Sequence, residues 1–300
     1  MTTLQALILG IVQGIAEFLP ISSSGHLIVL QRVFGIEEPH VTFDIFLHVG
    51  SLVAIVIVFW KDILEILKNP LSKMTGLLIV GSIPAVVAGV IMYTRGILEN
   101  SFRSGLWLAC AFIVTGVFLL LADKILDATK EAASQLPEGS GSGINSRCSG
   151  GDWGGAPLRT EREMTYMDAI VIGFFQALAL PPGISRSGTT IMGGLSRGLN
   201  RKTAAKFSFM LAIIAIAGAG LLDLVASLRG SGYDERFADA AYIGAVPMIV
   251  GFVASVVVGY FSIRLLLELI NKCKLKYFSF YVWGLAALVL VDYFIVNRFF

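Results

Sequence analysis

The chain has 300 residues, of which 56% are hydrophobic and only 15% are charged, and its net charge is +2. Together with a mean hydropathy of +0.79, this composition excludes an ordinary soluble domain, in which about a quarter of the residues are charged. We therefore expect an all-α polytopic membrane protein.

Six apolar runs approach the roughly 20 residues that a helix needs to cross a bilayer. They lie at about 43–60, 75–93, 105–123, 207–227, 241–263 and 279–297. Two further runs, 3–19 and 167–181, are too short to span comfortably. They are stopped by Pro20 and by Pro181-Pro182, because proline lacks a backbone donor and clashes with the preceding turn. We predict that each is the first arm of a re-entrant helical hairpin.

The two short runs belong to a duplicated motif. Gly10–His26 reads GIVQGIAEFLPISSSGH, and Gly173–Thr189 reads GFFQALALPPGISRSGT, which match without a gap at seven positions that include the Gly, Gln and Ser residues. Three spans follow each motif, so the two copies enter the membrane from opposite sides. The pattern predicts an inverted-topology repeat, with residues 1–127 as the first copy and 165–300 as the second.

The halves are joined by residues 128–164, whose centre is rich in Gly and Ser and predicts a flexible linker without chemistry of its own. If both hairpins return to their side of origin, most Lys and Arg residues fall on the face that carries this linker. Such a bias predicts that the linker is cytoplasmic and that both termini lie outside.

The second motif contains Arg186, a charge that is costly at membrane depth and is normally retained for a partner or a substrate. Four residues with hydroxyl groups stand around it in the sequence, namely Ser185, Ser187, Thr189 and Thr190. Guanidinium donors, hydroxyl groups and a helix N-terminus together are typical of a phosphate site. The alternative is a buried arginine that pairs with a carboxylate such as Glu17 or Asp223.

The first motif combines Glu17, Ser22, Ser23, Ser24 and His26 within a short stretch. A carboxylate, hydroxyl groups and an imidazole are the components of nucleophilic catalysis with general acid and base assistance. Taken singly, the serines could instead cap a helix, and the histidine could satisfy one hydrogen bond. These alternatives weaken if the acid, the histidine and the arginine of the second motif meet near one midplane.

A second polar pair, Asp44 and His48, stands at the start of the run 43–60. The two residues are four positions apart and therefore share one face of a helix. We interpret them as a local helix-stabilising contact.

The motifs also carry a family resemblance that covers essentially the whole chain. Gln13-x-x-x-Glu17 with Pro20-Ile-Ser-Ser-Ser-Gly-His26, and Pro182-Gly-Ile-Ser-Arg-Ser-Gly-Thr-Thr190, closely resemble the two signature motifs of bacterial undecaprenyl pyrophosphate phosphatases of the bacitracin-resistance type. The resemblance implies an enzyme of the bacterial plasma (inner) membrane. Such an enzyme removes a phosphate from undecaprenyl pyrophosphate, the lipid on which bacitracin acts, and thereby recycles the carrier for cell-wall synthesis.

The resemblance also implies roles for individual residues. Glu17, Ser23, His26 and Arg186 are expected to be catalytic, with the arginine as the pyrophosphate clamp. The remaining motif positions are expected to bind substrate, namely Gln13, Ser22, Ser24, Ser185, Ser187 and Thr190. The family's activity is associated with Mg²⁺ or Ca²⁺, for which Glu17 is the candidate ligand. Gln13 stands where many members have a second Glu, which makes a two-carboxylate metal site less secure here.

The expected reaction is attack on the terminal phosphoryl group by Ser23, assisted by Glu17 or His26, with Arg186 stabilising the developing charge. His26 as nucleophile and an activated water remain open. The expected partners are the polyprenyl pyrophosphate and membrane lipids, with a homodimer as the candidate assembly and no nucleic acid.

Three other functions compete with this prediction. A phosphatidic-acid-phosphatase type of enzyme would share Ser24-Gly25-His26, but it needs a histidine after Ser185-Arg186, and the sequence has none there. A lipid-carrier flippase or secondary transporter is the stronger alternative, because inverted repeats with midplane breaks are transporter architecture. A binding-only role in antibiotic resistance is weaker.

Overall fold

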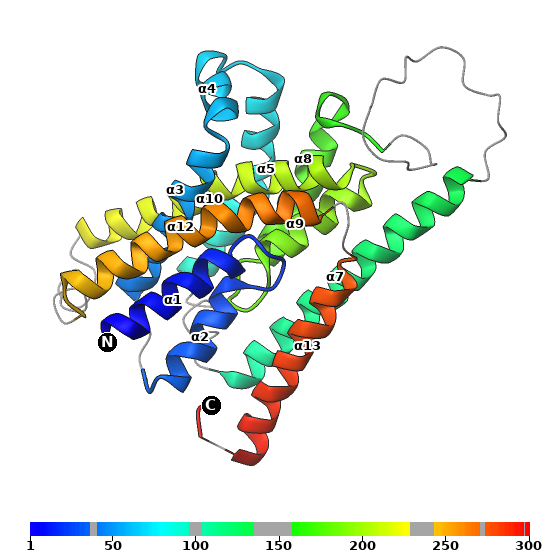
Figure 1. The fold of residues 1–300 in the computed structure, drawn as a ribbon. Helices are drawn as coiled ribbons and strands as arrows, with labels where there is room; N and C mark the ends of the chain where they lie inside the picture. The colour runs from blue at the N-terminus through cyan, green and yellow to red at the C-terminus, as the bar shows by residue number, and fades with distance from the viewer. Residues whose placement is uncertain (37–40, 96–103, 135–157, 229–242, 271–273, 297) are drawn as a thin grey trace, which may run out of the picture.

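The computed structural model describes residues 1–36, 41–95, 104–134, 158–228, 243–270, 274–296 and 298–300. Over these ranges the chain is all-α, apart from an isolated bridge between Arg159 and Leu199 (Figure 1). The first half contains α1 (Thr3–Ala16), α2 (Ser23–Val33), α3 (Val41–Val58), α4 (Trp60–Lys68), α5 (Lys73–Thr94) and α7 (Gly105–Ser134). The second half contains a 3-10 turn (Glu161–Glu163), α8 (Tyr166–Leu178), α9 (Arg186–Ser196), α10 (Arg201–Leu228), α12 (Ala245–Leu269), α13 (Lys276–Val291) and a π-helical turn (Asp292–Val296).

Among the described residues, five helices are long and apolar enough to cross a membrane: α5, α7, α10, α12 and α13. They correspond to five of the six predicted spans. The sixth prediction, 43–60, coincides with α3, and α4 follows it at an angle of 78°. Taken together, α3 and α4 are long and apolar enough to count as a sixth, bent span, although α4 itself carries charged residues such as Lys61 and Asp62. The chain is therefore a multi-pass membrane protein.

The two shorter apolar helices, α1 and α8, occupy the places of the predicted first hairpin arms. A proline ring clashes with the carbonyl group four residues before it. Pro20 accordingly ends α1 at Ala16, and Pro182 ends α8 at Leu178, slightly earlier than predicted. After each break the chain forms a second short helix, α2 or α9, that packs against the first.

Each first arm packs against a long helix of the other half, α1 against α12 and α8 against α5. Both crossings are close because glycine faces glycine. A Cβ atom on Gly10 would collide with the carbonyl oxygen of Gly251, and one on Gly173 with that of Gly81. The two halves are therefore interlocked, while α7 and α13 lie side by side (Figure 1).

Apolar packing fixes the turn that follows α1. Phe18 is fully buried, and its ring lies edge-on to that of Phe209 on α10, with the centroids 5.7 Å apart. Phe209 in turn contacts Phe59 at the end of α3. The largest buried cluster therefore begins directly beside Glu17 and holds the first hairpin against the second half of the chain.

The predicted linker 128–164 lies mostly outside the described residues. Its two described ends are ordered, because α7 continues to Ser134 and Arg159 donates two hydrogen bonds to Asp168, at 2.9 and 3.0 Å. Asp168 is fully buried and also accepts from Arg197 at 2.8 Å. A buried carboxylate needs such cationic partners, so the second end of the predicted linker is fixed to α8 and α9.

Candidate active site

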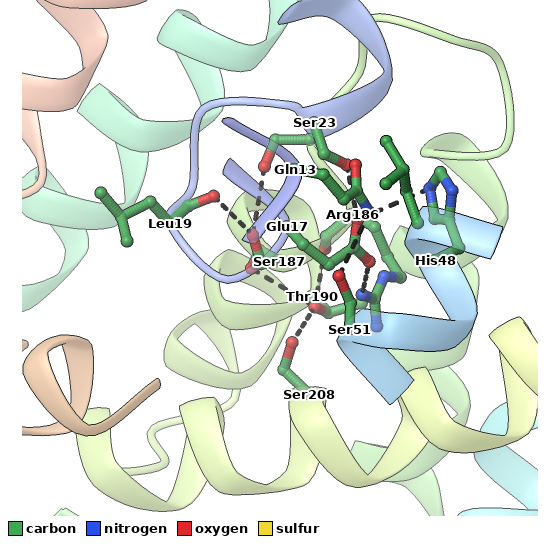
Figure 2. Close-up of polar contacts among 12 residues, drawn as sticks. Gln13, Glu17, Leu19, Ser23, His48, Ser51, Arg186, Ser187, Thr190 and Ser208 are labelled. Carbon is green, nitrogen blue, oxygen red and sulfur yellow. Dashed lines mark hydrogen bonds and ion pairs between the residues drawn. The ribbon is translucent and has the colours of Figure 1, made fainter. Parts of the chain in front are cut away.

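The turns of the two hairpins meet at an ion pair between Glu17 and Arg186. Glu17 directly follows α1, and Arg186 is the first residue of α9. The Oε1 and Nη2 atoms lie 2.5 Å apart, and the side chains are only 5% and 16% exposed. Figure 2 shows the two groups facing each other from opposite hairpins. The sequence allowed either a phosphate site or a buried arginine paired with a carboxylate, and the structure contains the buried pair.

Ser23 lies on the other side of the same carboxylate. Its hydroxyl group donates a hydrogen bond of 2.5 Å to Glu17 Oε2 (Figure 2). A hydrogen bond that an ionised carboxylate accepts is short and strong. Since Ser23 is the first residue of α2, the hairpin break places a hydroxyl group and a carboxylate in direct contact, in the arrangement of a nucleophile and its base.

His48 belongs to the same group of side chains, which the sequence interpretation missed. Its Nδ1 atom is 2.7 Å from the carbonyl oxygen of Asp44, so the predicted local contact is present, but through the backbone. Its Nε2 atom faces Glu17 Oε2 at 3.7 Å. The signal in the sequence was a polar face on an otherwise apolar helix, formed by Asp44, His48 and Ser51 at spacings of four and three.

Gln13 connects Glu17 to a chain of buried polar groups. Its Nε2 atom donates to Glu17 Oε2 at 3.2 Å and lies 3.3 Å from the Ser51 hydroxyl oxygen. Ser51 is in turn 3.1 Å from Ser255 on α12, and both are fully buried. This chain fixes the carboxylate from the side of α3 and α12.

Two buried polar atoms of the site lack a hydrogen-bond partner within the described residues, namely Nη1 of Arg186 and Oε1 of Gln13. A buried donor without a partner costs about 1–3 kcal/mol, and more when it is charged. An anion beside the arginine would satisfy Nη1. The unsatisfied guanidinium donor therefore favours the second interpretation as well, that of a phosphate site.

His26 is not brought to this carboxylate. Its Nδ1 atom lies 2.7 Å from the Ser22 carbonyl oxygen, and its Nε2 atom lies 2.9 Å from the Tyr281 hydroxyl group on α13. The two rings stack with an interplanar angle of 11°, and Phe112 of α7 packs edge-on against the imidazole. The histidine therefore faces α7 and α13, away from Glu17.

The remaining motif hydroxyl groups hold the hairpins in shape. Ser22 and Ser185 occupy equivalent positions, and each caps the following helix by accepting from the backbone N–H group three residues on. Ser24 accepts from the N–H group of Gly183, and Ser187 donates to the carbonyl oxygen of Leu19, so both serines tie one hairpin to the other.

Two further features complete the hairpin framework. Thr190 bonds within α9 and contacts Ser208 on α10 at 2.6 Å (Figure 2). Ser22 has φ of +72°, a left-handed conformation that costs a non-glycine residue about 1 kcal/mol or more. Such strain is typical of functional sites and here lies one residue before Ser23.

The donor set around Glu17 does not fit a protein-held divalent cation. Mg²⁺ and Ca²⁺ take several oxygen ligands, whereas the oxygens of the Glu17 carboxylate already accept from Arg186, Ser23 and Gln13. No group of three His, Cys, Asp or Glu side chains that could bind a metal occurs within the described residues. The Mg²⁺ or Ca²⁺ expected from the resemblance stays a prediction, and no step below uses it.

Comparison with known proteins shows the family to which the chain belongs. Residues 6–288 match the family described as bacitracin resistance protein BacA. The chain is 41% identical to the undecaprenyl-diphosphatase of Carboxydothermus hydrogenoformans over 97% of each sequence. It is 38% identical to undecaprenyl-diphosphatase 4 of a Bacillus cereus strain, also over 97% of each. The chain therefore belongs to the bacitracin resistance protein BacA family.

Proposed function

We propose that the chain is an undecaprenyl-diphosphatase, which hydrolyses undecaprenyl pyrophosphate to undecaprenyl phosphate and inorganic phosphate. The names of the curated relatives support the substrate and the reaction. The observation that carries the proposal is the Glu17 carboxylate, which contacts the Ser23 hydroxyl group on one side and the Arg186 guanidinium on the other. These groups supply a base, a nucleophile and an anion clamp in one place.

In the proposed reaction the Ser23 oxygen attacks the terminal phosphorus of the lipid pyrophosphate. Glu17 accepts the hydroxyl proton through the hydrogen bond already present. The bond between phosphorus and the bridging oxygen breaks, and undecaprenyl phosphate leaves. Water then hydrolyses the phosphoserine and releases inorganic phosphate. His26 has less support as nucleophile, because both of its ring nitrogens are engaged elsewhere.

Arg186 binds the pyrophosphate and stabilises the charge that develops on the transferred phosphoryl group. Its Nη1 atom lies buried without a partner among the described residues, and its Nη2 atom is paired with Glu17. Phosphoryl transfer depends mainly on such positioning and charge stabilisation. A pyrophosphate bound at Nη1 shares the guanidinium charge with Glu17, which weakens the ion pair and leaves the carboxylate free to accept the Ser23 proton.

The membrane layout of the proposal is an inverted-topology repeat in the bacterial plasma membrane, with re-entrant hairpins and both termini outside. The reciprocal packing of α1 on α12 and of α8 on α5 supports the repeat. So does a local match between the two long helices, since Ile79-Val80-Gly81 of α5 and Ile249-Val250-Gly251 of α12 supply the glycines for the two crossings. A homodimer stays a prediction.

The test is phosphate release from undecaprenyl pyrophosphate by the purified protein in detergent. The wild type should release phosphate, and Glu17→Ala and Arg186→Ala should each lose at least about 1,000-fold in kcat, because each removes a charged group from the transition state. Both variants must elute from a sizing column like the wild type. A folded wild-type protein that releases no phosphate would refute the proposal.

A further inference from the structure

His48 contacts the carboxylate at the centre of the site and belongs to neither signature motif. It lies on α3, which packs against α1. Its Nδ1 atom is 2.7 Å from the Asp44 carbonyl oxygen. A carbonyl oxygen can only accept, so Nδ1 carries a hydrogen. This bond fixes the ring on its own helix and directs Nε2 toward Glu17 Oε2, 3.7 Å away (Figure 2). Because Nδ1 holds the one hydrogen of a neutral ring, Nε2 donates to the carboxylate only when both ring nitrogens carry hydrogen.

The position of His48 complements that of Arg186. The arginine pairs with Oε1, whereas His48 faces Oε2, the oxygen that also accepts from Ser23. The His48 side chain is 31% exposed and that of Glu17 only 5%. The imidazole is therefore the more exposed of the two groups, and it lies beside Oε2, the oxygen that accepts the hydrogen bond from Ser23.

Substrate binding changes which partners Glu17 retains. A pyrophosphate bound at the unpaired Nη1 atom of Arg186 would share the guanidinium charge and so weaken the pairing of Nη2 with Glu17 Oε1. Gln13 then contributes one neutral donor at 3.2 Å, and the imidazole is the remaining nitrogen group beside Oε2 among the described residues. Contacts that are long in a free enzyme commonly shorten in the substrate complex, and a shift of Nε2 by less than about 1 Å would bring it within hydrogen-bond distance.

We propose that His48 is a positioning residue: with hydrogen on both ring nitrogens it donates from Nε2 to Glu17 and holds the carboxylate on the Ser23 hydroxyl group when the pyrophosphate shares Arg186. The inference rests on the proposed phosphatase function and adds to it a residue outside both motifs. His48 acts through the carboxylate and does not touch the reacting phosphorus. Its loss should therefore lower kcat and leave KM nearly unchanged.

Two amide substitutions separate this role from a local helix contact. The side-chain nitrogen of Asn reaches about as far as Nδ1 of a histidine, and that of Gln about as far as Nε2. His48→Asn can keep the bond to the Asp44 carbonyl oxygen but does not reach Glu17. His48→Gln can reach Glu17 but gives up the local bond. The local interpretation and the proposal thus predict opposite orders of activity.

The experiment measures kcat and KM for phosphate release from undecaprenyl pyrophosphate. We expect His48→Gln to stay within about threefold of the wild-type kcat and His48→Asn to fall by about tenfold or more, the effect of one hydrogen bond to a charged group. KM should change by less than about twofold in both. Ser82→Ala is the matched control, because Ser82 also bonds the carbonyl group four residues earlier, that of Leu78, at 2.8 Å. It should leave kcat unchanged.

The inference is overturned if His48→Asn keeps wild-type kcat, if His48→Gln falls as far as His48→Asn, or if the loss appears in KM alone. The melting temperature of each variant in detergent is compared with that of Ser82→Ala, which loses a local bond of the same kind away from the site. Failure of the proposed function has a different signature, because then the wild type itself would release no phosphate.

Discussion

The two hairpins share one framework and differ in what they contribute to the site. In both, a serine caps the second arm, a glycine allows close packing of the first arm, and a buried glutamine has an Oε1 atom without a partner among the described residues. Two of the aligned positions at which they differ carry the proposed chemistry. Leu180 replaces Glu17, and Arg186 replaces Ser23. Capping and packing are thus common to both copies, whereas the proposed base and nucleophile belong to one and the proposed anion clamp to the other.

The largest expected effect comes from the divergent position of the first hairpin. Ser23→Ala removes the hydroxyl group that contacts Glu17 and should lower kcat by at least about 1,000-fold, as expected for loss of a nucleophile. Ser24→Ala is the neighbouring control, since that hydroxyl group accepts from Gly183 and its loss should cost no more than about tenfold, the effect of one hydrogen bond. Equal losses in phosphate release from the two variants would show that Ser23 has no special role.

A second prediction concerns the glycines that the two hairpins share. Gly10→Ala and Gly173→Ala should each destabilise the protein by about 1–3 kcal/mol, because the added methyl group meets the backbone of the opposite helix. Gly218→Ala on α10 is the control, because a Cβ atom there meets no described atom within 4 Å, and should be neutral or stabilise slightly. Thermal unfolding in detergent measures the change. A large effect in only one hairpin would contradict the equivalence of the two crossings.

The smallest expected effect concerns the histidine that faces away from Glu17. Tyr281→Phe removes the hydroxyl partner of His26 Nε2 and keeps the ring stacked on the imidazole. It should cost about 1 kcal/mol of stability, the usual value of one hydrogen bond, and change kcat by less than about threefold. Melting temperature and phosphate release check the two parts. A kcat loss comparable to that of Ser23→Ala would place His26 and Tyr281 in the reaction.

Local patterns in the sequence predicted much of this arrangement. Apolar length indicated the long helices, and Pro20 and Pro182 ended the short ones because a proline ring acts on the turn directly before it. The motif repeat predicted that the hairpins meet, and the structure brings Glu17 and Arg186 into contact.

Tertiary contacts account for what the sequence did not reveal. His26 has the spacing expected of a catalytic group, yet its ring direction depends on Tyr281 on α13. His48 was interpreted as a local contact because the sequence does not show that its second nitrogen meets Glu17, a residue of the first hairpin. Periodicity indicates the face on which a side chain lies, but it does not indicate which distant helix covers that face.

The most direct test of a single site shared by both hairpins is a double-mutant cycle of phosphate release. Glu17→Asp and Arg186→Lys each shorten one side of the contact between Glu17 Oε1 and Arg186 Nη2, and both keep their charge, so residual activity stays measurable. If the contact acts as one unit, the double variant should lose less activity than the product of the two single losses, with a coupling of at least about 1 kcal/mol. Losses that simply multiply would contradict the account.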